Sequence, residues 1–124
     1  MVLVDTSVWI DHLRKGDAAL RSALEAGQVL MHPFVQGELA CGNLNNRADL
    51  LALLRDLPPA PAATDAEVLG FVDRHQLMDR GIGYLDVHLL PSTALAGPAR
   101  VWTRDKRLAT VAGHLNLTYH PQAH

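Results

Sequence analysis

The first ten residues, MVLVDTSVWI, constrain the fold of this chain more than any other segment. Residues 2–4 form an apolar run without polar alternation, which is typical of a central parallel strand covered on both faces. Asp5 ends this run, and Thr6 and Ser7 supply hydroxyls of the kind that cap a helix, here expected over residues 8–14. Ligands of open α/β sheets bind beyond the carboxyl ends of the strands. Asp5 therefore either belongs to a functional crevice or only caps the helix.

Length and charge limit the classes of protein to consider. The chain has 124 residues, of which 48% are hydrophobic and 5% aromatic, which favours one aliphatic-cored domain over residues 1–124. The formal net charge of −2 argues against binding nucleic acid by bulk positive charge alone. It leaves open a nuclease whose positive charge comes from bound metal ions.

Cysteine content and the N-terminus indicate the compartment. Cys41 is the single cysteine, which rules out an intramolecular disulfide and fits a reducing cytosol. We interpret Cys41 as a small buried apolar residue. The N-terminus has no basic segment followed by an apolar one, and no apolar run reaches about 18 residues. We therefore expect a cytoplasmic protein with no membrane association.

Short apolar runs alternate with helical patterns, which predicts an α/β sandwich around a mainly parallel sheet. Further strands are expected over residues 29–31, 100–103 and 115–119. Further helices are expected over residues 18–26, 33–41, 47–57, 64–80, 84–95 and 105–113. Residues 57–63 contain three prolines and predict an extended connector, and residues 122–124 are expected to fray. The buried side of the helix at 64–80 is expected to comprise Val68, Leu69, Phe71, Val72 and Leu77.

Four of the thirteen acidic residues stand out by their positions: Asp5, Glu38, Asp86 and Asp105. Asp5 and Asp105 follow predicted strands, and parallel strands would bring both to the same edge of the sheet. Converging carboxylates raise one another's pKa unless a cation lies between them. Mg²⁺ fits such a site, because it binds a few carboxylates and completes its octahedron with water and substrate phosphate. The acids are far apart in sequence, so spacing alone leaves their convergence open.

Four segments together resemble PIN-domain ribonucleases: DTSVWIDHL around Asp5, GELACG around Glu38, GYLDVHLL around Asp86 and VWTRDKRL around Asp105. The resemblance is greatest to the VapC toxins of bacterial toxin–antitoxin pairs. It covers essentially the whole chain, with the motifs in the family's order.

This resemblance implies a PIN-like three-layer α/β/α sandwich and an endoribonuclease dependent on Mg²⁺ or Mn²⁺. Asp5, Glu38, Asp86 and Asp105 match the family's catalytic, metal-binding acids. Thr6 and Thr103 match hydroxyl positions that orient carboxylates or water. The family also implies a VapB antitoxin whose C-terminal tail crosses the active-site groove, a homodimer, and a structured RNA substrate such as transfer or ribosomal RNA. The expected products carry a 5′-phosphate and a 3′-hydroxyl.

Pro91 departs from the family pattern, because it falls within the helix expected over residues 84–95. A proline there removes a hydrogen bond to the carbonyl of Val87, at a cost of about 3 kcal/mol if unrelieved. We predict a kink that leaves the turn around Asp86 intact.

The basic residues Arg104, Lys106 and Arg107 surround Asp105 and either hold RNA phosphates or form a solvated helix face. His88 is expected in a packing or surface role, and Trp9 and Trp102 as core or interface anchors.

Two other functions compete with a ribonuclease. A strand-end aspartate also serves as the nucleophile of aspartyl-phosphate phosphohydrolases. That pattern requires a second aspartate two residues later, where this chain has Ser7. The other alternative is a PIN-like module that binds RNA or protein without catalysis, although all four acids are present.

Overall fold

The computed structural model describes residues 1–121 and contains a sheet of three short strands, all parallel. The strands are β1 (Val2–Val4), β2 (Val29–Leu30) and β3 (Arg100–Trp102). Their order is β2-β1-β3, and Leu3 of β1 lies opposite Leu30 on one side and Val101 on the other. The first strand of the chain is therefore the central one, as its apolar sequence predicts.

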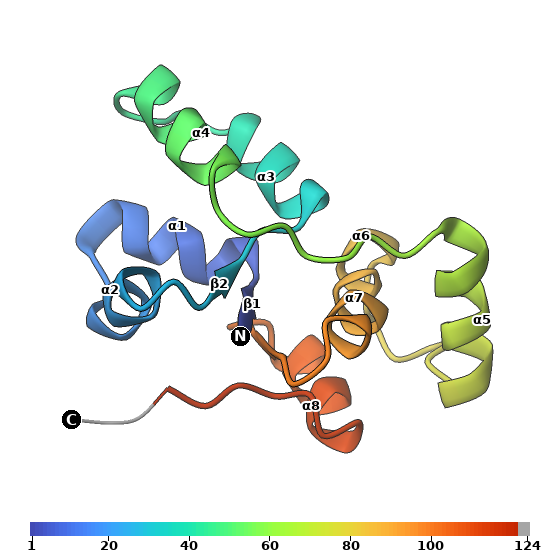
Figure 1. Cartoon of the computed structure of the whole chain (residues 1–124). Coiled ribbons are helices and arrows are strands. Elements are labelled where there is room, and N and C mark those ends of the chain that lie inside the picture. Colours follow the sequence, from blue (N-terminus) through green and yellow to red (C-terminus); the bar gives the residue numbers. More distant parts are fainter. Residues whose placement is uncertain (122–124) are drawn as a thin grey trace.

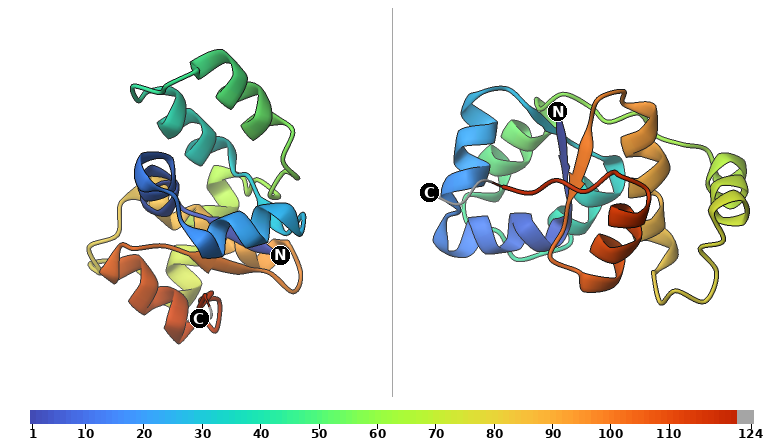
Figure 2. Two further views of the ribbon diagram at one scale, coloured as in Figure 1. Left: turned by 90° about the vertical axis from the view of Figure 1, so that its left-hand side faces the viewer. Right: turned by 90° about the horizontal axis from the view of Figure 1, so that it is seen from below.

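Helices cover both faces of this sheet. They are α1 (Thr6–Lys15), α2 (Ala18–Glu25), α3 (Pro33–Ala40), α4 (Arg47–Arg55), α5 (Asp65–His75), α6 (Tyr84–Val87), α7 (Leu89–Leu95) and α8 (Lys106–His114). In Figure 1 and in the left view of Figure 2, α3 and α4 lie above the sheet and α8 lies below it. The predicted three-layer α/β/α sandwich with a parallel central sheet is confirmed. Within residues 1–121, no helix is both long enough and apolar enough to cross a membrane.

The core forms around β1, whose residues are 0–2% exposed. Trp9 from α1 and Trp102 from β3 are also buried, as expected of core anchors. Because β1 pairs on both edges and packs on both faces, the residue that follows it is held on a rigid part of the fold.

The connector over residues 57–63 takes part in the sheet, which the sequence did not predict. Met31 donates its N–H to the carbonyl of Pro58 (2.8 Å) and accepts the N–H of Ala60 (2.9 Å), forming an isolated parallel bridge at Pro59. At the other edge, residues 115–119 form one bridge between Thr118 and Val101 instead of the full predicted strand.

The helix expected over residues 64–80 is shorter than predicted. It begins after Thr64 and ends at His75, because Gln76 adopts a left-handed conformation with φ of 54°. Val68 is fully buried, but Leu69 is 56% exposed, so its predicted place in the core is wrong. Cys41 was also wrongly predicted to be buried, because it caps the end of α3 and is exposed.

A kink was predicted at Pro91, and the structure shows an interruption of the helix three residues earlier, at His88. The expected helix is divided at His88 into α6 and α7, and Pro91 occupies the first turn of α7, where a backbone N–H has no helical partner. The turn around Asp86 is intact, since Val87 donates its N–H to the carbonyl of Gly83 (3.0 Å). The expectation for residues 122–124 lies outside the described residues.

Candidate active site

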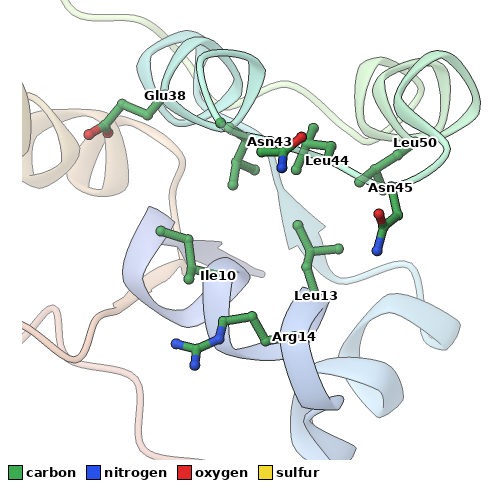
Figure 3. Close-up of a pocket in the computed structure, with 10 residues that line it drawn as sticks. Ile10, Leu13, Arg14, Glu38, Asn43, Leu44, Asn45 and Leu50 are labelled. Atoms are coloured by element: carbon green, nitrogen blue, oxygen red, sulfur yellow. The ribbon is translucent and has the colours of Figure 1, made fainter.

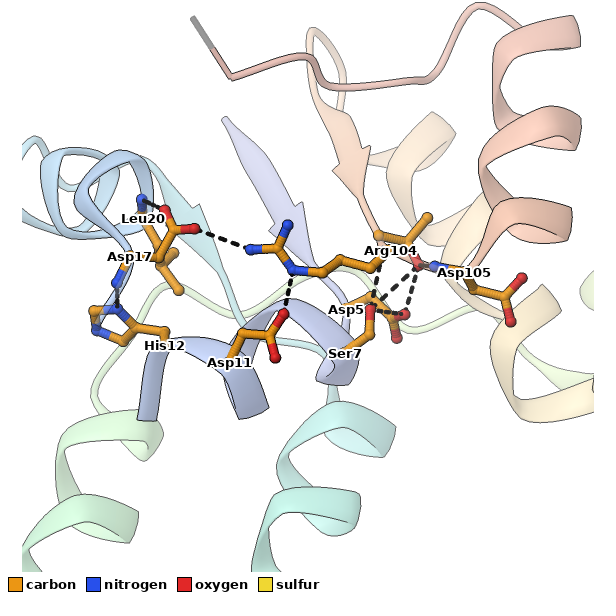
Figure 4. Close-up of polar contacts among 9 residues, drawn as sticks. Asp5, Ser7, Asp11, His12, Asp17, Leu20, Arg104 and Asp105 are labelled. Atoms are coloured by element: carbon orange, nitrogen blue, oxygen red, sulfur yellow. Dashed lines mark hydrogen bonds and ion pairs between the residues drawn. The ribbon is translucent and has the colours of Figure 1, made fainter. Parts of the chain in front are cut away.

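Asp5 lies at the carboxyl end of β1, where the register places it beside the end of β3. Its backbone N–H donates to the carbonyl of Trp102 (2.9 Å). The side chain caps α1 by accepting the N–H of Thr6 at Oδ1 (2.8 Å). Oδ2 accepts hydrogen bonds from the hydroxyls of Ser7 (2.9 Å) and Thr103 (2.7 Å), as Figure 4 shows for Ser7 and Asp5. The carboxylate is 5% exposed and fixed by three donors.

The same two hydroxyls hold the loop between β3 and α8. Thr103 Oγ1 accepts the N–H of Asp105 (3.0 Å), and Ser7 Oγ accepts the N–H of Arg104 (3.0 Å). Each hydroxyl thus donates to Asp5 and accepts from this loop, which couples the position of one acid to the other. From the sequence, Ser7 was predicted only as a helix-capping residue. Its position two residues after Asp5 is the feature of the sequence that could have indicated its contact with that carboxylate.

Glu38 reaches this edge of the sheet from α3. Thr6 Oγ1 donates a hydrogen bond to Glu38 Oε1 (2.9 Å). Thr6 therefore contacts two of the four acids, Glu38 through its hydroxyl and Asp5 through its backbone. The structure places Thr6 and Thr103 where side chains that orient carboxylates are expected.

Asp86 lies near enough to the other three acids for their negative charges to affect its pKa. Its pKa is raised, first by burial and then by the negative charges of Asp5, Glu38 and Asp105. Acids that cap α1 and α8 therefore share one region of negative potential with acids from α3 and α6. Repulsion of this kind is relieved by protonation or by a bound cation.

Asp105 is turned toward its own helix. Its Oδ1 accepts the N–H groups of Arg107 (2.9 Å) and Leu108 (3.0 Å), which caps α8. Among residues 1–121, no three His, Cys, Asp or Glu side chains are arranged as ready-made metal ligands. The four acids nevertheless supply only oxygen donors, which suit a hard cation such as Mg²⁺. Joint binding of an ion would thus require side-chain rotation.

Arg104, expected either to hold RNA phosphates or to lie on a solvated helix face, pairs with two carboxylates of its own chain. Its Nε lies 2.6 Å from Asp11 Oδ2, and its Nη2 lies 2.9 Å from Asp17 Oδ2 (Figure 4). The pKa of Asp17 is lowered, mainly by the N–H of Leu20 and further by Arg104. Two of the guanidinium nitrogens, Nε and Nη2, thus contact protein carboxylates, so Arg104 joins the β3–α8 loop to α1 and α2.

His88 packs behind α6 and is 2% exposed. Its ring centroid lies 4.6 Å from that of Phe34 and 4.7 Å from that of Tyr84, which matches the packing role expected for it. The neighbouring His32 is also buried, and burial followed by His88 lowers its pKa to about 4. His32 Nδ1 accepts the N–H of Phe34 (3.0 Å) and so caps α3, the helix that carries Glu38.

A largely apolar groove of about 600 Å³ opens beside Glu38. It runs between α1, α3 and the start of α4, and its lining includes Ile10, Leu13, Arg14, Leu44 and Leu50 (Figure 3). Ile10 and Leu13 are 45% and 36% exposed, so α1 presents apolar side chains at the surface next to the acids.

The sheet order and the acids gathered at its edge define a PIN domain. The PIN domain family model matches residues 2–114, and the chain belongs to this family. Two curated relatives carry the name ribonuclease VapC32, one from Mycobacterium tuberculosis strain CDC 1551 and one from strain H37Rv. The chain is 51% identical to each over 108 residues, which cover 87% of this chain and 87% of the relative.

Proposed function

We propose that this chain is an endoribonuclease toxin of a toxin–antitoxin pair, which hydrolyses phosphodiester bonds in RNA with the help of Mg²⁺ or Mn²⁺. The observation that carries the proposal is the gathering of acids at one edge of the sheet: Thr6 contacts both Asp5 and Glu38, and Thr103 connects Asp5 to the backbone of Asp105. The same acids also raise the pKa of Asp86. Such a concentration of carboxylates suits a divalent cation. The similarity to proteins named ribonuclease VapC32 supports RNA as the substrate.

Asp5, Glu38, Asp86 and Asp105 would hold the ion. When bound, a divalent cation supplies a water of lowered pKa and offsets charge on the phosphodiester. The protein's own contribution is orientation. Ser7 and Thr103 fix one oxygen of Asp5, and Thr6 directs Glu38 toward the shared region.

A VapB-like antitoxin is the expected partner, with a structured RNA such as transfer or ribosomal RNA as substrate and the cytoplasm as the compartment. The apolar groove beside Glu38 supports an antitoxin segment that crosses this side of the site, because it exposes Ile10 and Leu13 next to an acid. Homodimerisation is expected from the family, and the exposed Leu53 on α4 is compatible with an interface.

One observation favours a second candidate, a PIN-like module that binds RNA or protein without catalysis. The carboxylate of Asp105 is engaged by its own helix. An aspartyl-phosphate phosphohydrolase is less well supported, because two hydroxyls already occupy the Asp5 oxygen that faces Ser7 and Thr103.

Cleavage of total RNA by the purified, antitoxin-free chain separates these candidates. We expect discrete fragments with Mg²⁺ or Mn²⁺ and a loss of about 100-fold or more in the Asp5→Asn variant. EDTA should have the same effect. Asp73→Asn removes an equal charge from the exposed face of α5 and should cleave normally. Cleavage that persists in both EDTA and Asp5→Asn would contradict the proposed mechanism.

A further inference from the structure

Three cationic side chains line a shallow cavity along α8. Lys106 and Arg107 begin α8, and Arg80 belongs to the segment that joins α5 to α6. With Thr110 and Val111 they enclose about 200 Å³. Arg80, Lys106 and Arg107 are called the basic cluster below.

Specific contacts hold the two arginines of this cluster. Arg80 Nη2 lies 3.3 Å from His114 Nδ1 and must be the donor, because a guanidinium has no acceptor. Arg107 lies against Gly81, where a Cβ atom would be 2.8 Å from Arg107 Cδ. Gly81 also has a φ of 74°, so a side chain at this position would be strained and would displace Arg107.

The cluster carries uncompensated positive charge. Within residues 1–121, no member of the basic cluster forms an ion pair with a carboxylate. Arg104 differs, since Asp11 and Asp17 neutralise it. In a chain with a net charge of −2, this cavity is therefore a local concentration of positive charge.

Both segments that form the basic cluster also carry an acid of the candidate active site. Asp105 caps α8 immediately before Lys106, and the segment containing Arg80 leads into α6 with Asp86. The apolar groove lies elsewhere, between α1 and α3 beside Glu38. The apolar groove and the basic cavity thus share no lining residue.

We propose that the basic cluster binds backbone phosphates of the RNA strand beside the cleaved bond. This inference rests on the proposed ribonuclease function. Arginine forks match phosphate oxygens in geometry and charge. Phosphate contacts position a strand without reading its bases. The cluster therefore contributes to affinity for RNA of any sequence, and base preference comes from other residues.

RNA binding by the Asp5→Asn chain tests the cluster without cleavage. The probe is a short fluorescein-labelled RNA of mixed sequence, titrated at several salt concentrations. In this background, Arg80→Gln and Arg107→Gln should each weaken binding about 3- to 10-fold. The double variant should reduce the slope of log affinity against log salt by about 1.4, since each single-strand phosphate contact contributes about 0.7. The matched control Arg55→Gln removes an exposed charge at the end of α4 and should change neither quantity.

The variant Arg107→Lys tests the role of charge in RNA binding, because it keeps the positive charge at this position. It should retain most of the salt slope, because lysine still contacts phosphate as a point charge. Affinities and slopes equal to those of Arg55→Gln would overturn the assignment of the cluster. Failure of the proposed function has a different signature, since the unmodified chain would then leave total RNA uncut in Mg²⁺ whatever the binding results.

Discussion

Asp86 is the acid whose protonation depends most visibly on its neighbours. Burial and three nearby negative charges raise its pKa above the ordinary value. A raised pKa in the folded state means that the ionised carboxylate destabilises the metal-free fold. The stability contributed by protonated Asp86 is fully present below the unfolded-state pKa of about 3.9 and is lost as the pH rises through the folded-state value.

Asp86→Asn should therefore stabilise the metal-free protein at pH 7. We expect a gain of up to about 1 kcal/mol, because solvent screens a partly exposed charge. The gain should disappear below about pH 3.9, where the parent acid is protonated as well. Urea unfolding in EDTA at both pH values measures this difference. Equal stability of the parent and Asp86→Asn at pH 7 would show that the acids do not repel one another appreciably.

Thr103 is the residue whose hydroxyl connects two acids, through a bond to Asp5 Oδ2 (2.7 Å) and one from the Asp105 N–H (3.0 Å). Thr103→Val keeps the shape and removes both bonds. We expect RNA cleavage to fall about 10- to 100-fold, as for other groups that orient metal ligands. Thr93→Val is the matched control, because its hydroxyl donates to the Leu89 carbonyl of its own helix, away from the proposed site. Single-turnover cleavage assays should separate the two variants, and similar rates would contradict this role.

At the scale of elements, the ion pairs of Arg104 connect the loop before α8 to the helices α1 and α2. Arg104 contacts Asp11 on α1 and Asp17 at the start of α2 from the loop before α8. Its side chain is 41% exposed, so each pair contributes modestly.

Arg104→Ala should lower the free energy of unfolding by about 1 kcal/mol, the sum expected for two partly exposed ion pairs. Because its charge is already neutralised by protein carboxylates, the salt slope of RNA binding should stay unchanged. Urea denaturation and the RNA titration described for the basic cluster provide the two readouts. A reduced slope would return Arg104 to the phosphate-binding residues.

Elements set by local chemistry could be predicted from the sequence, and those set by distant contacts could not. The apolar run of β1 and the ring of Pro91 act on their own neighbourhood, so the central strand and a distortion of the helix that contains Pro91 were both expected. Leu69 has the right helical spacing for the core, but its exposure depends on how little of α5 is covered by the rest of the chain.

The candidate site shows the same division. The edge shared by Asp5 and Asp105 follows from parallel strands, whereas the engagement of Arg104 depends on Asp11 and Asp17, which lie far away in the sequence. Arg80 likewise joins the basic cluster only through folding.

At the scale of the whole molecule, the acids come from four elements spread between residues 5 and 105. The unfolded chain scatters these carboxylates, so a divalent cation that they hold together binds the folded state almost exclusively. Ligand binding of this kind stabilises the fold by RT ln(1 + [L]/Kd), about 2.7 kcal/mol at 100 times the Kd.

Saturating Mg²⁺ should accordingly raise the thermal unfolding midpoint relative to EDTA, with a stabilisation that grows with the logarithm of its concentration. Asp5→Asn and Asp105→Asn should lose most of this response, because each removes a carboxylate from the shared region. Asp73→Asn should respond as the parent does, since it lies on α5. In Mg²⁺ the parent should become more stable than Asp86→Asn, the reverse of the order in EDTA. The carboxylates that repel one another in the metal-free protein attract the cation. An equal response in all variants would place the ion elsewhere on the surface.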